Sequence, residues 1–306
     1  MLRRIGCTAL LLFALLPALA EAAIARIDIV VSPNNTNLLD MAGGIEHALS
    51  RRWPNLAVKI SHSDSYAITD TQTTLLVTMG DGMLPWLAAH AGEFPFSLAF
   101  YVNSAAFGDI AKADGKTTAL YRDQPLSRQL ELAKLLVPNL QRAAVIHSPS
   151  VTLGNLESLE RGSRVRIANA KLSSDNDWAK ILAQLMRDND VLLGIEDPQI
   201  YNSNTIRSIL LTTYRHGKVL IGPSRPFVNA GSLASCYTAS DQYLQQLLTM
   251  IATTLQEQRV PRPQFPKAYR VSVNPQVAAS LGLNLPNEIA LTTMLQRQLG
   301  ECGDDC

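Results

Sequence analysis

Residues 27–49 read IDIVVSPNNTNLLDMAGGIEHAL and decide the fold class. Residues 27–31 form a near-continuous apolar run, which is typical of a buried strand in a parallel sheet. Apolar residues then recur at spacings of four, three and four, the period of one helix face: Leu38, Ala42, Ile45 and Leu49. The stretch therefore predicts a strand followed by a helix, the basic unit of an α/β protein.

The same alternation continues along the chain. A first series adds strands at 57–60, 75–79 and 97–101 and a short helix at 83–91. A second series begins near Thr118 with a strand at 119–121 and a helix that ends before Pro138. Further strands follow at 143–147, 164–168, 191–195 and 219–221, with helices between them. Because so many strands in one sheet would be unusually wide, the pattern predicts two similar lobes joined near residues 113–123.

The chain beyond Phe227 adds elements to two lobes that are already complete. It predicts a strand at 232–237 and a long helix from about 240 to 258, followed by prolines at 261, 263 and 266. Prolines at this density exclude a helix and make a stiff, extended connection. A strand at 269–273 and helices from Pro275 and Pro286 close the chain. Such a segment can cross back between the lobes, and several crossings make a hinge.

We therefore expect an α/β protein of two Rossmann-like lobes with parallel sheets, joined by a multi-crossover hinge. Residues 23–117 and about 228–266 are expected to form the first lobe. Residues 118–227 and about 267–299 are expected to form the second. Residues 300–306 are expected to be a polar tail that contains cysteines.

The first 22 residues have the pattern of a signal peptide. Arg3 and Arg4 form a positive region, residues 9–19 form an apolar run, and Ala20 and Ala22 occupy the small-residue positions of a cleavage site. The apolar run is shorter than the ~20 residues that span a bilayer. Cys7 precedes the apolar region, whereas a lipid-modified cysteine follows it. The sequence thus predicts a soluble protein exported to the periplasm, with an uncleaved anchor helix as the alternative.

The composition restricts the class of partner. Lys and Arg number 27 against 26 Asp and Glu, and charged residues make up 17% of the chain. So few charges, with 47% hydrophobic residues, exclude a disordered chain. The balance of charge also argues against nucleic acid, which requires a concentrated basic surface.

Three cysteines remain after the predicted signal peptide. Cys302 and Cys306 flank Gly-Asp-Asp in the tail, and a small disulfide loop is the expected outcome, with a metal or free thiols as alternatives. Two thiolates without a nearby histidine make a poor zinc site, so no metal is expected. Cys236 lies in an apolar stretch and is interpreted as a small buried side chain.

Ligands of open parallel sheets bind at the carboxyl ends of the strands. The residues at those ends are the candidate ligand-binding set: Asn35, Thr36, Gly80, Asp81, Tyr101, Ser148, Ser150, Asp197 and Ser224. A well-capped loop is the alternative for each, because Asn, Ser and Gly are ordinary turn residues. Arg225 could pair with a ligand carboxylate or with a surface acid.

Familiar enzyme signatures are missing from the sequence. It contains no Gly-x-Ser-x-Gly elbow, no His-Glu-x-x-His and no phosphate-binding Gly-Lys-Ser/Thr loop. The five histidines show no metal-ligand spacing, and Gly80-Asp81-Gly82 lacks the third glycine of a dinucleotide fingerprint. We therefore expect neither an enzyme nor a bound cofactor.

Several segments resemble one family. They are residues 132–146 (LAKLLVPNLQRAAVI), residues 190–194 (DVLLG) with Asp197, residues 218–222 (KVLIG) with 227–235 (FVNAGSLAS), and residues 273–274 with 278–286 (AASLGLNLP). Together they resemble the ABC-transporter substrate-binding proteins related to the tryptophan/tyrosine-type binding proteins. The resemblance is good over residues 118–290 and only general over 24–117. It implies a type I periplasmic-binding fold, an inner-membrane permease as partner, and aromatic amino acids as the ligands of the nearest relatives.

The predicted function is capture of a small molecule, an amino acid or similar polar metabolite, between two lobes for delivery to an ABC permease. The protein is expected to act as a monomer. The family's Gly-Gly-Asn-Val-Thr-Gly stretch is replaced here by residues 112–118. This departure motivates an alternative, a periplasmic interaction or sensor protein without transport. A serine hydrolase that uses Ser148, Ser150 or Ser224 is a third hypothesis.

Overall fold

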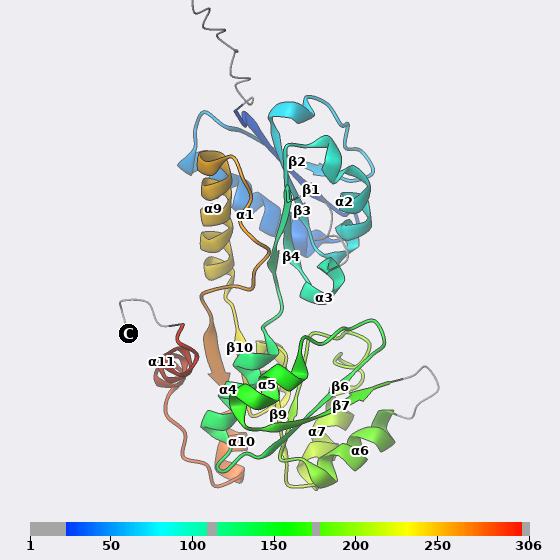
Figure 1. Cartoon of the computed structure of the whole chain (residues 1–306), viewed down its shortest axis with the longest axis vertical. Helices are drawn as coiled ribbons and strands as arrows, with labels where there is room; N and C mark the ends of the chain where they lie inside the picture. Colours follow the sequence, from blue (N-terminus) through cyan, green and yellow to red (C-terminus); the bar gives the residue numbers. More distant parts are fainter. Residues whose placement is uncertain (1–22, 109–114, 173–177, 302–306) are drawn as a thin grey trace, which may run out of the picture.

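The computed structural model describes residues 23–108, 115–172 and 178–301. The expected signal peptide and the expected disulfide between Cys302 and Cys306 therefore lie outside the described residues. Two α/β lobes are stacked along the long axis of the molecule (Figure 1). The predicted fold class is confirmed.

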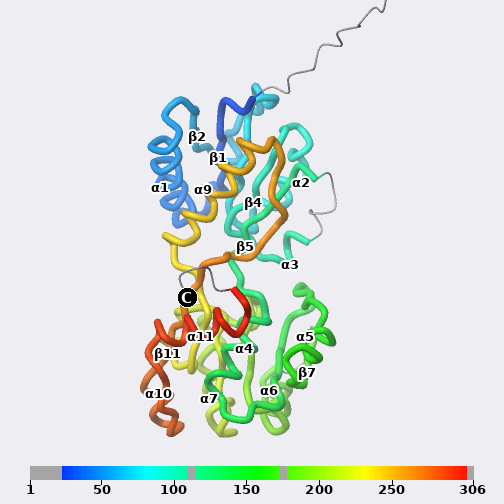
Figure 2. The backbone as a smooth tube through the Cα atoms, turned by 60° about the vertical axis from the view of Figure 1, so that its left-hand side comes forward, coloured from blue at the N-terminus to red at the C-terminus, as the bar shows by residue number. Residues whose placement is uncertain are grey.

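The first sheet is parallel throughout. Its strands, in spatial order, are β2 (Ala57–His62), β1 (Arg26–Val31), β3 (Thr74–Met79), β4 (Phe96–Val102) and β5 (Thr117–Tyr121). Its helices are α1 (Thr36–Arg52), α2 (Leu84–His90), α3 (Ser104–Phe107) and α9 (Ser240–Glu257). Helices α1 and α9 lie side by side over one face (Figure 2), while α2 and α3 pack on the other.

The second sheet is mixed because its last strand runs against its neighbour. Its strands, in spatial order, are β11 (Arg270–Val273), β10 (Ala234–Tyr237), β9 (Val219–Ile221), β8 (Val191–Leu193), β6 (Arg142–His147) and β7 (Arg166–Lys171). Helices α4 (Leu126–Leu136), α10 (Pro275–Ser280) and α11 (Glu288–Leu299) pack on one face, with α5 (Leu156–Ser163) beside them. Helices α6 (Trp178–Asp188) and α7 (Ile206–Arg215) cover the other, and α8 (Arg225–Ala230) follows β9.

The strand period of two explains why each sheet is covered on both faces. In β1, Ile27, Ile29 and Val31 pack beneath α1 and α9, whereas Val30 belongs to the core on the α2 side. All four side chains are fully buried. Complete burial of a side chain of this size contributes about 1.5–3 kcal/mol. A run that is apolar at nearly every position is therefore stable only between two helical layers, as the sequence predicts.

The chain crosses between the lobes after β5, after β10 and after α9. Two boundaries between the lobes differ from the expected ones. Thr117–Tyr121 pairs with β4 in the first sheet, so the first lobe extends past residue 117. Ala234–Tyr237 pairs in the second sheet, so the second lobe extends past residue 227. The apolar pattern of a strand shows that it is buried, whereas its lobe depends on which strand it pairs with.

Two strands of the second lobe also differ from the expected ranges. Arg164 has a φ of 61° and ends α5, so β7 begins at Arg166 and not at 164. β8 ends at Leu193 and not at 195; it is followed by Gly194, where an added Cβ would lie 2.8 Å from Pro223 Cδ. Cys236 is fully buried, as expected, and burial raises the pKa of its thiol.

Candidate ligand-binding site

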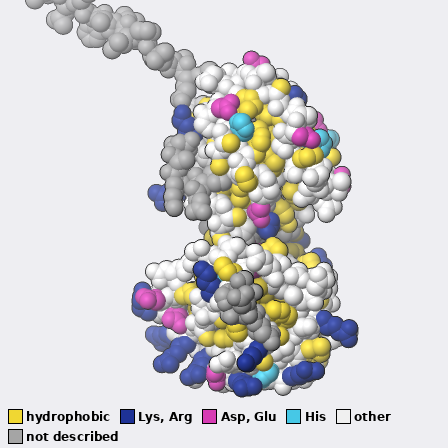
Figure 3. Space-filling view, turned by 90° about the vertical axis from the view of Figure 1, so that its right-hand side faces the viewer, with side chains coloured by type: hydrophobic (Ala, Val, Ile, Leu, Met, Phe, Trp, Pro, Cys, Tyr) yellow, Lys and Arg dark blue, Asp and Glu magenta, His cyan; other side chains and the backbone are white. Residues whose placement is uncertain are grey.

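The carboxyl ends of strands from both sheets meet at the waist of the molecule. Asn103 follows β4 in the first lobe, and Glu196 follows β8 in the second. The Asn103 Nδ2 amide donates to the backbone carbonyl of Glu196 at 3.2 Å. Acidic and basic side chains gather at this waist in the space-filling view (Figure 3). The two lobes thus touch where a ligand of a parallel sheet is expected to bind.

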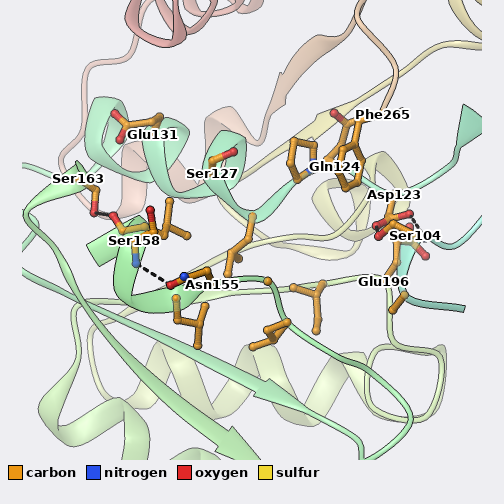
Figure 4. A pocket seen from close by; sticks show the side chains of 18 of the residues that line it. Ser104, Asp123, Gln124, Ser127, Glu131, Asn155, Ser158, Ser163, Glu196 and Phe265 are labelled. Carbon is orange, nitrogen blue, oxygen red and sulfur yellow. Dashed lines mark hydrogen bonds between the residues drawn. The ribbon is translucent and has the colours of Figure 1, made fainter. Parts of the chain in front are cut away.

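A cavity of about 750 Å³ opens beside this contact (Figure 4). Asn103, Ser104 and Ala105 contribute to it from the first lobe. Residues 123–127 line it from the first crossing and the start of α4, and residues 151–156 and Ser158 line it from the loop and helix α5. Because both lobes supply walls, the volume of the cavity depends on how far the lobes are open.

The wall formed by the second lobe is shaped by the start of α5. Asn155 is the N-cap of that helix, and its Oδ1 accepts the backbone N–H of Ser158 at 2.9 Å. The cap satisfies one of the free amide groups of the first turn. Leu156 and Leu159 pack toward the core of the lobe and also line the cavity. The floor of the cavity is therefore apolar and well ordered by its neighbours.

Asp123 lies at the end of the cavity nearest the waist. Its Oδ1 accepts the backbone N–H of Ser104 at 2.8 Å, and its Oδ2 accepts the Ser104 hydroxyl at 2.5 Å. Burial raises the pKa of Asp123 above its usual range despite these hydrogen bonds. Figure 4 shows Ser104, Asp123 and Glu196 together at this end and Glu131 at the opposite end.

Arg122 links the two lobes electrostatically. Its Nη1 lies 2.8 Å from Asp81 Oδ2 in the first lobe, and its Nε lies 3.9 Å from Glu196 Oε2 in the second. Burial raises the pKa of Glu196 to about 7, and the attraction of Arg122 opposes this shift only in part because Asp123 and Asp81 repel the charge. Three carboxylates thus share one guanidinium at the waist.

Two aspartates play equivalent parts in the two lobes. Asp81, after β3, accepts the N–H of Asn103 through Oδ1 at 2.6 Å. Asp197, after β8, accepts the N–H of Ser148 through Oδ2 at 2.6 Å and that of Gln199 through Oδ1 at 3.1 Å. Asp197 is 1% exposed. Each carboxylate therefore holds a neighbouring strand-end loop in place.

The other residues named from the sequence also lie at strand ends, in different surroundings. Asn35 and Thr36 are exposed at the start of α1, where Asn35 Oδ1 accepts the N–H of Leu38 at 3.1 Å. Ser148 and Ser150 meet through their hydroxyls at 2.7 Å. Ser224 is half-buried before α8, and its carbonyl accepts the N–H of Phe227 at 3.0 Å.

Gly80 and Tyr101 both have positive φ angles and pack against other residues of the first lobe. Gly80 has a φ of 80°, and an added Cβ would lie 2.5 Å from Leu38 Cδ1. Tyr101 has a φ of 58°, and its ring lies 5.3 Å from that of Tyr243 on α9. None of the nine residues named from the sequence is among the described residues that line the 750 Å³ cavity.

Sequence reasoning missed the cavity-lining residues Ser104, Asp123 and Glu196. Glu196 stands next to Asp197, and the strand-end rule led to the choice of Asp197, whereas Glu196 lines the cavity. Asp123 lies two residues beyond the end of β5. That strand was assigned to the wrong lobe, so its end was not counted as part of the first sheet. A correct sheet order would have identified Asp123 as a strand-end residue.

Comparison with solved structures supports the fold. An ABC domain in complex with L-Trp from Streptococcus pneumonia superposes with a TM-score of 0.58 and 16% identity, over 87% of this chain and 97% of that chain. A ligand-free, open substrate-binding protein with adhesive properties from Clostridium difficile superposes with a TM-score of 0.62 and 14% identity, over 86% of this chain and 97% of that chain. A periplasmic ribose ABC transporter protein from Conexibacter woesei superposes with a TM-score of 0.52 and 8% identity, over 86% of this chain and 96% of that chain.

These similarities show that the chain has the type I periplasmic-binding fold implied by the sequence resemblance. No family model matches the sequence, and no curated protein matches it. In the described part of the chain, no helix combines the length and the apolar character needed to cross a membrane.

Proposed function

We propose that this chain is an exported solute-binding protein that captures one small molecule between its lobes and delivers it to the permease of an ABC transporter. The observation that carries the proposal is the cavity of about 750 Å³ with walls from both lobes. Ligand pockets of proteins are typically about 300–1,000 Å³. The cavity therefore has the size of a small-molecule site.

The proposed mechanism is closure around a ligand. The backbone connects the described parts of the two lobes through the three crossings, so a change of a few backbone torsions there alters the opening between the lobes. A ligand that contacts Ser104 in the first lobe and the 151–156 loop in the second has more contacts in the closed state. It therefore shifts the population toward closure by the free energy of those extra contacts. No bond of the ligand has to break.

The strand-end residues named from the sequence belong to the same proposal. Asn35, Thr36 and Ser150 are exposed and lie outside the cavity lining, and in this proposal closure of the lobes brings their polar groups to the ligand. Asp81 and Asp197 act by holding the loops that carry Asn103 and Ser148. Export through the segment 1–22, a soluble monomer and a permease partner complete the proposal.

A thermal-shift screen of amino acids, amines, sugars and nucleosides against residues 23–306 tests it, because a bound ligand raises the melting temperature by mass action. Ala105→Trp narrows the cavity from the first lobe and should abolish the shift. Ala106→Trp is the matched control, since Ala106 is exposed and does not line the cavity. Absence of any stabilising compound, with an envelope protein co-purifying, would favour the interaction-protein alternative.

A further inference from the structure

The charges of the cavity are unevenly placed along its length. Of the described residues that line it, Asp123, Glu131, Lys134 and Glu196 have ionisable side chains. Lys134 Nζ lies 2.8 Å from Glu131 Oε2, so those two charges cancel at one end. The carboxylates of Asp123 and Glu196 remain at the other end, next to Ser104 and Asn103 (Figure 4).

The nearest cation, Arg122, neutralises these two carboxylates only in part. Arg122 lies 2.8 Å from Asp81 and only 3.9 Å from Glu196, so its strongest partner is outside the cavity lining. Burial raises the pKa of Asp123 and that of Glu196, and the attraction of Arg122 opposes each shift only in part. Carboxyl groups that line a cavity and carry such shifts are candidates for a functional site.

Much of the cavity wall is apolar. It includes Leu126, Val151, Leu153, Leu156, Ile195 and Phe265. A polar ligand would lose its hydration against these side chains without recovering hydrogen bonds there. The one basic side chain among the described lining residues, Lys134, is already paired with Glu131. A ligand carboxylate thus finds repulsion at one end and an occupied lysine at the other.

We propose, resting on the solute-binding function above, that the ligand is an organic cation: a protonated amine attached to an apolar body, without an ionised carboxylate. The ammonium group lies between Asp123 and Glu196. The apolar body lies along the wall formed by α4 and the 151–156 loop. Closure removes water from the ammonium and the carboxylates together, so their attraction strengthens as the lobes meet.

Two sets of matched probes test the ligand class. The first is 2-phenylethylamine, phenylalanine and 3-phenylpropionate, which share one apolar body and differ in charged groups. The second is hexylamine and hexanoate. Isothermal titration and thermal shift with residues 23–306 should show binding of the amines at least about tenfold tighter than that of phenylalanine, and no stabilisation by the carboxylates.

Variants locate the ammonium site. Glu196→Gln and Asp123→Asn should each weaken amine binding by about tenfold or more, because each removes a desolvated counter-charge. Glu157→Gln is the matched control: Glu157 is on α5, is 84% exposed and does not line the cavity. If Asp123→Asn disturbs the contacts with Ser104, the amine affinity of Glu196→Gln alone tests the ammonium position. The melting curve of each variant without ligand reports whether it is folded.

The outcomes separate this inference from the function on which it rests. If amino acids, sugars or carboxylates stabilise the protein and amines do not, the ligand class is wrong and solute binding stands. If amines bind equally well to Glu196→Gln and to the wild type, the assigned ammonium position is wrong. If no compound of any class binds, both proposals fail.

Discussion

The guanidinium of Arg128 forms a bidentate ion pair with the carboxylate of Glu301: Nη2 lies 2.9 Å from Oε1, and Nε lies 3.0 Å from Oε2. Arg128 is 4% exposed and stacks on the ring of Tyr269 at 4.2 Å. Its Nη1 donates to the carbonyl of Pro266 at 2.6 Å and to Gln124 Oε1 at 3.0 Å. One side chain of α4 therefore holds two of the lobe crossings and the end of the described chain.

The crossing after β10 joins the same network. Gln124 Nε2 donates to the hydroxyl of Thr238 at 2.9 Å, and that hydroxyl donates to the carbonyl of Ala268 at 3.0 Å. The crossings are thus tied to each other and to the second lobe.

Loss of the Arg128–Glu301 contact should destabilise the protein. Glu301→Gln leaves a buried guanidinium with a weaker partner, and we expect a loss of about 1–3 kcal/mol in the free energy of unfolding. Urea denaturation measures it. Glu157→Gln, which removes an exposed pair with Arg161, should change stability by less than about 0.5 kcal/mol. Equal effects of the two substitutions would contradict the network.

Glu196 should make stability depend on pH. Its pKa is raised from 4.5 to about 7, so the folded state holds the proton more strongly than the unfolded state. This contribution is fully present below about pH 4.5 and is lost as the pH rises through 7. The unfolding free energy of the wild type relative to Glu196→Gln should therefore fall by on the order of 1–3 kcal/mol between pH 5 and pH 8. A difference that is independent of pH would show that Glu196 titrates normally.

Asp197 should matter for stability through its two backbone partners. Asp197→Ala leaves the N–H groups of Ser148 and Gln199 without their acceptor, and we expect a loss of about 2–4 kcal/mol. Asp197→Asn keeps one acceptor and should cost less. Chemical denaturation of both variants provides the comparison. A ligand contact made by Asp197 itself would instead appear as lost binding with unchanged stability.

Gly80 and Gly82 form a matched pair two residues apart. Gly80→Ala meets both a φ of 80° and a clash with Leu38 Cδ1, so it should destabilise the protein by about 1–3 kcal/mol. Nothing lies within 4 Å of a Cβ added at Gly82. Gly82→Ala should therefore leave the thermal midpoint nearly unchanged. Similar midpoints for the two variants would show that Leu38 moves aside freely.

The elements of both lobes could be predicted because burial imposes a clear period on the sequence. The run at 27–31 and the spacing from Leu38 to Leu49 gave β1 and α1, and the prolines at 261, 263 and 266 gave the extended third crossing. Hydrophobic period depends only on which face of an element is buried, and a single sequence carries that information.

The cavity was harder to predict because it depends on pairing and on orientation. Asp123 and Asp81 both follow strands of the first sheet, yet only the pairing of β5 with β4 shows that they share an edge. Glu196 and Asp197 are adjacent, but Asp197 turns inward to hold Ser148 while Glu196 lines the cavity. The direction of a loop side chain is set by tertiary contacts that leave no period in the sequence.

Native mass spectrometry tests the central claim most directly. Residues 23–306, incubated with a metabolite extract and desalted gently, should retain one small molecule per chain. Ala105→Trp should retain none, and Ala106→Trp should behave as the wild type. Retention of the same molecule by Ala105→Trp, or the absence of any bound species from the folded wild type, would contradict a ligand site between the lobes.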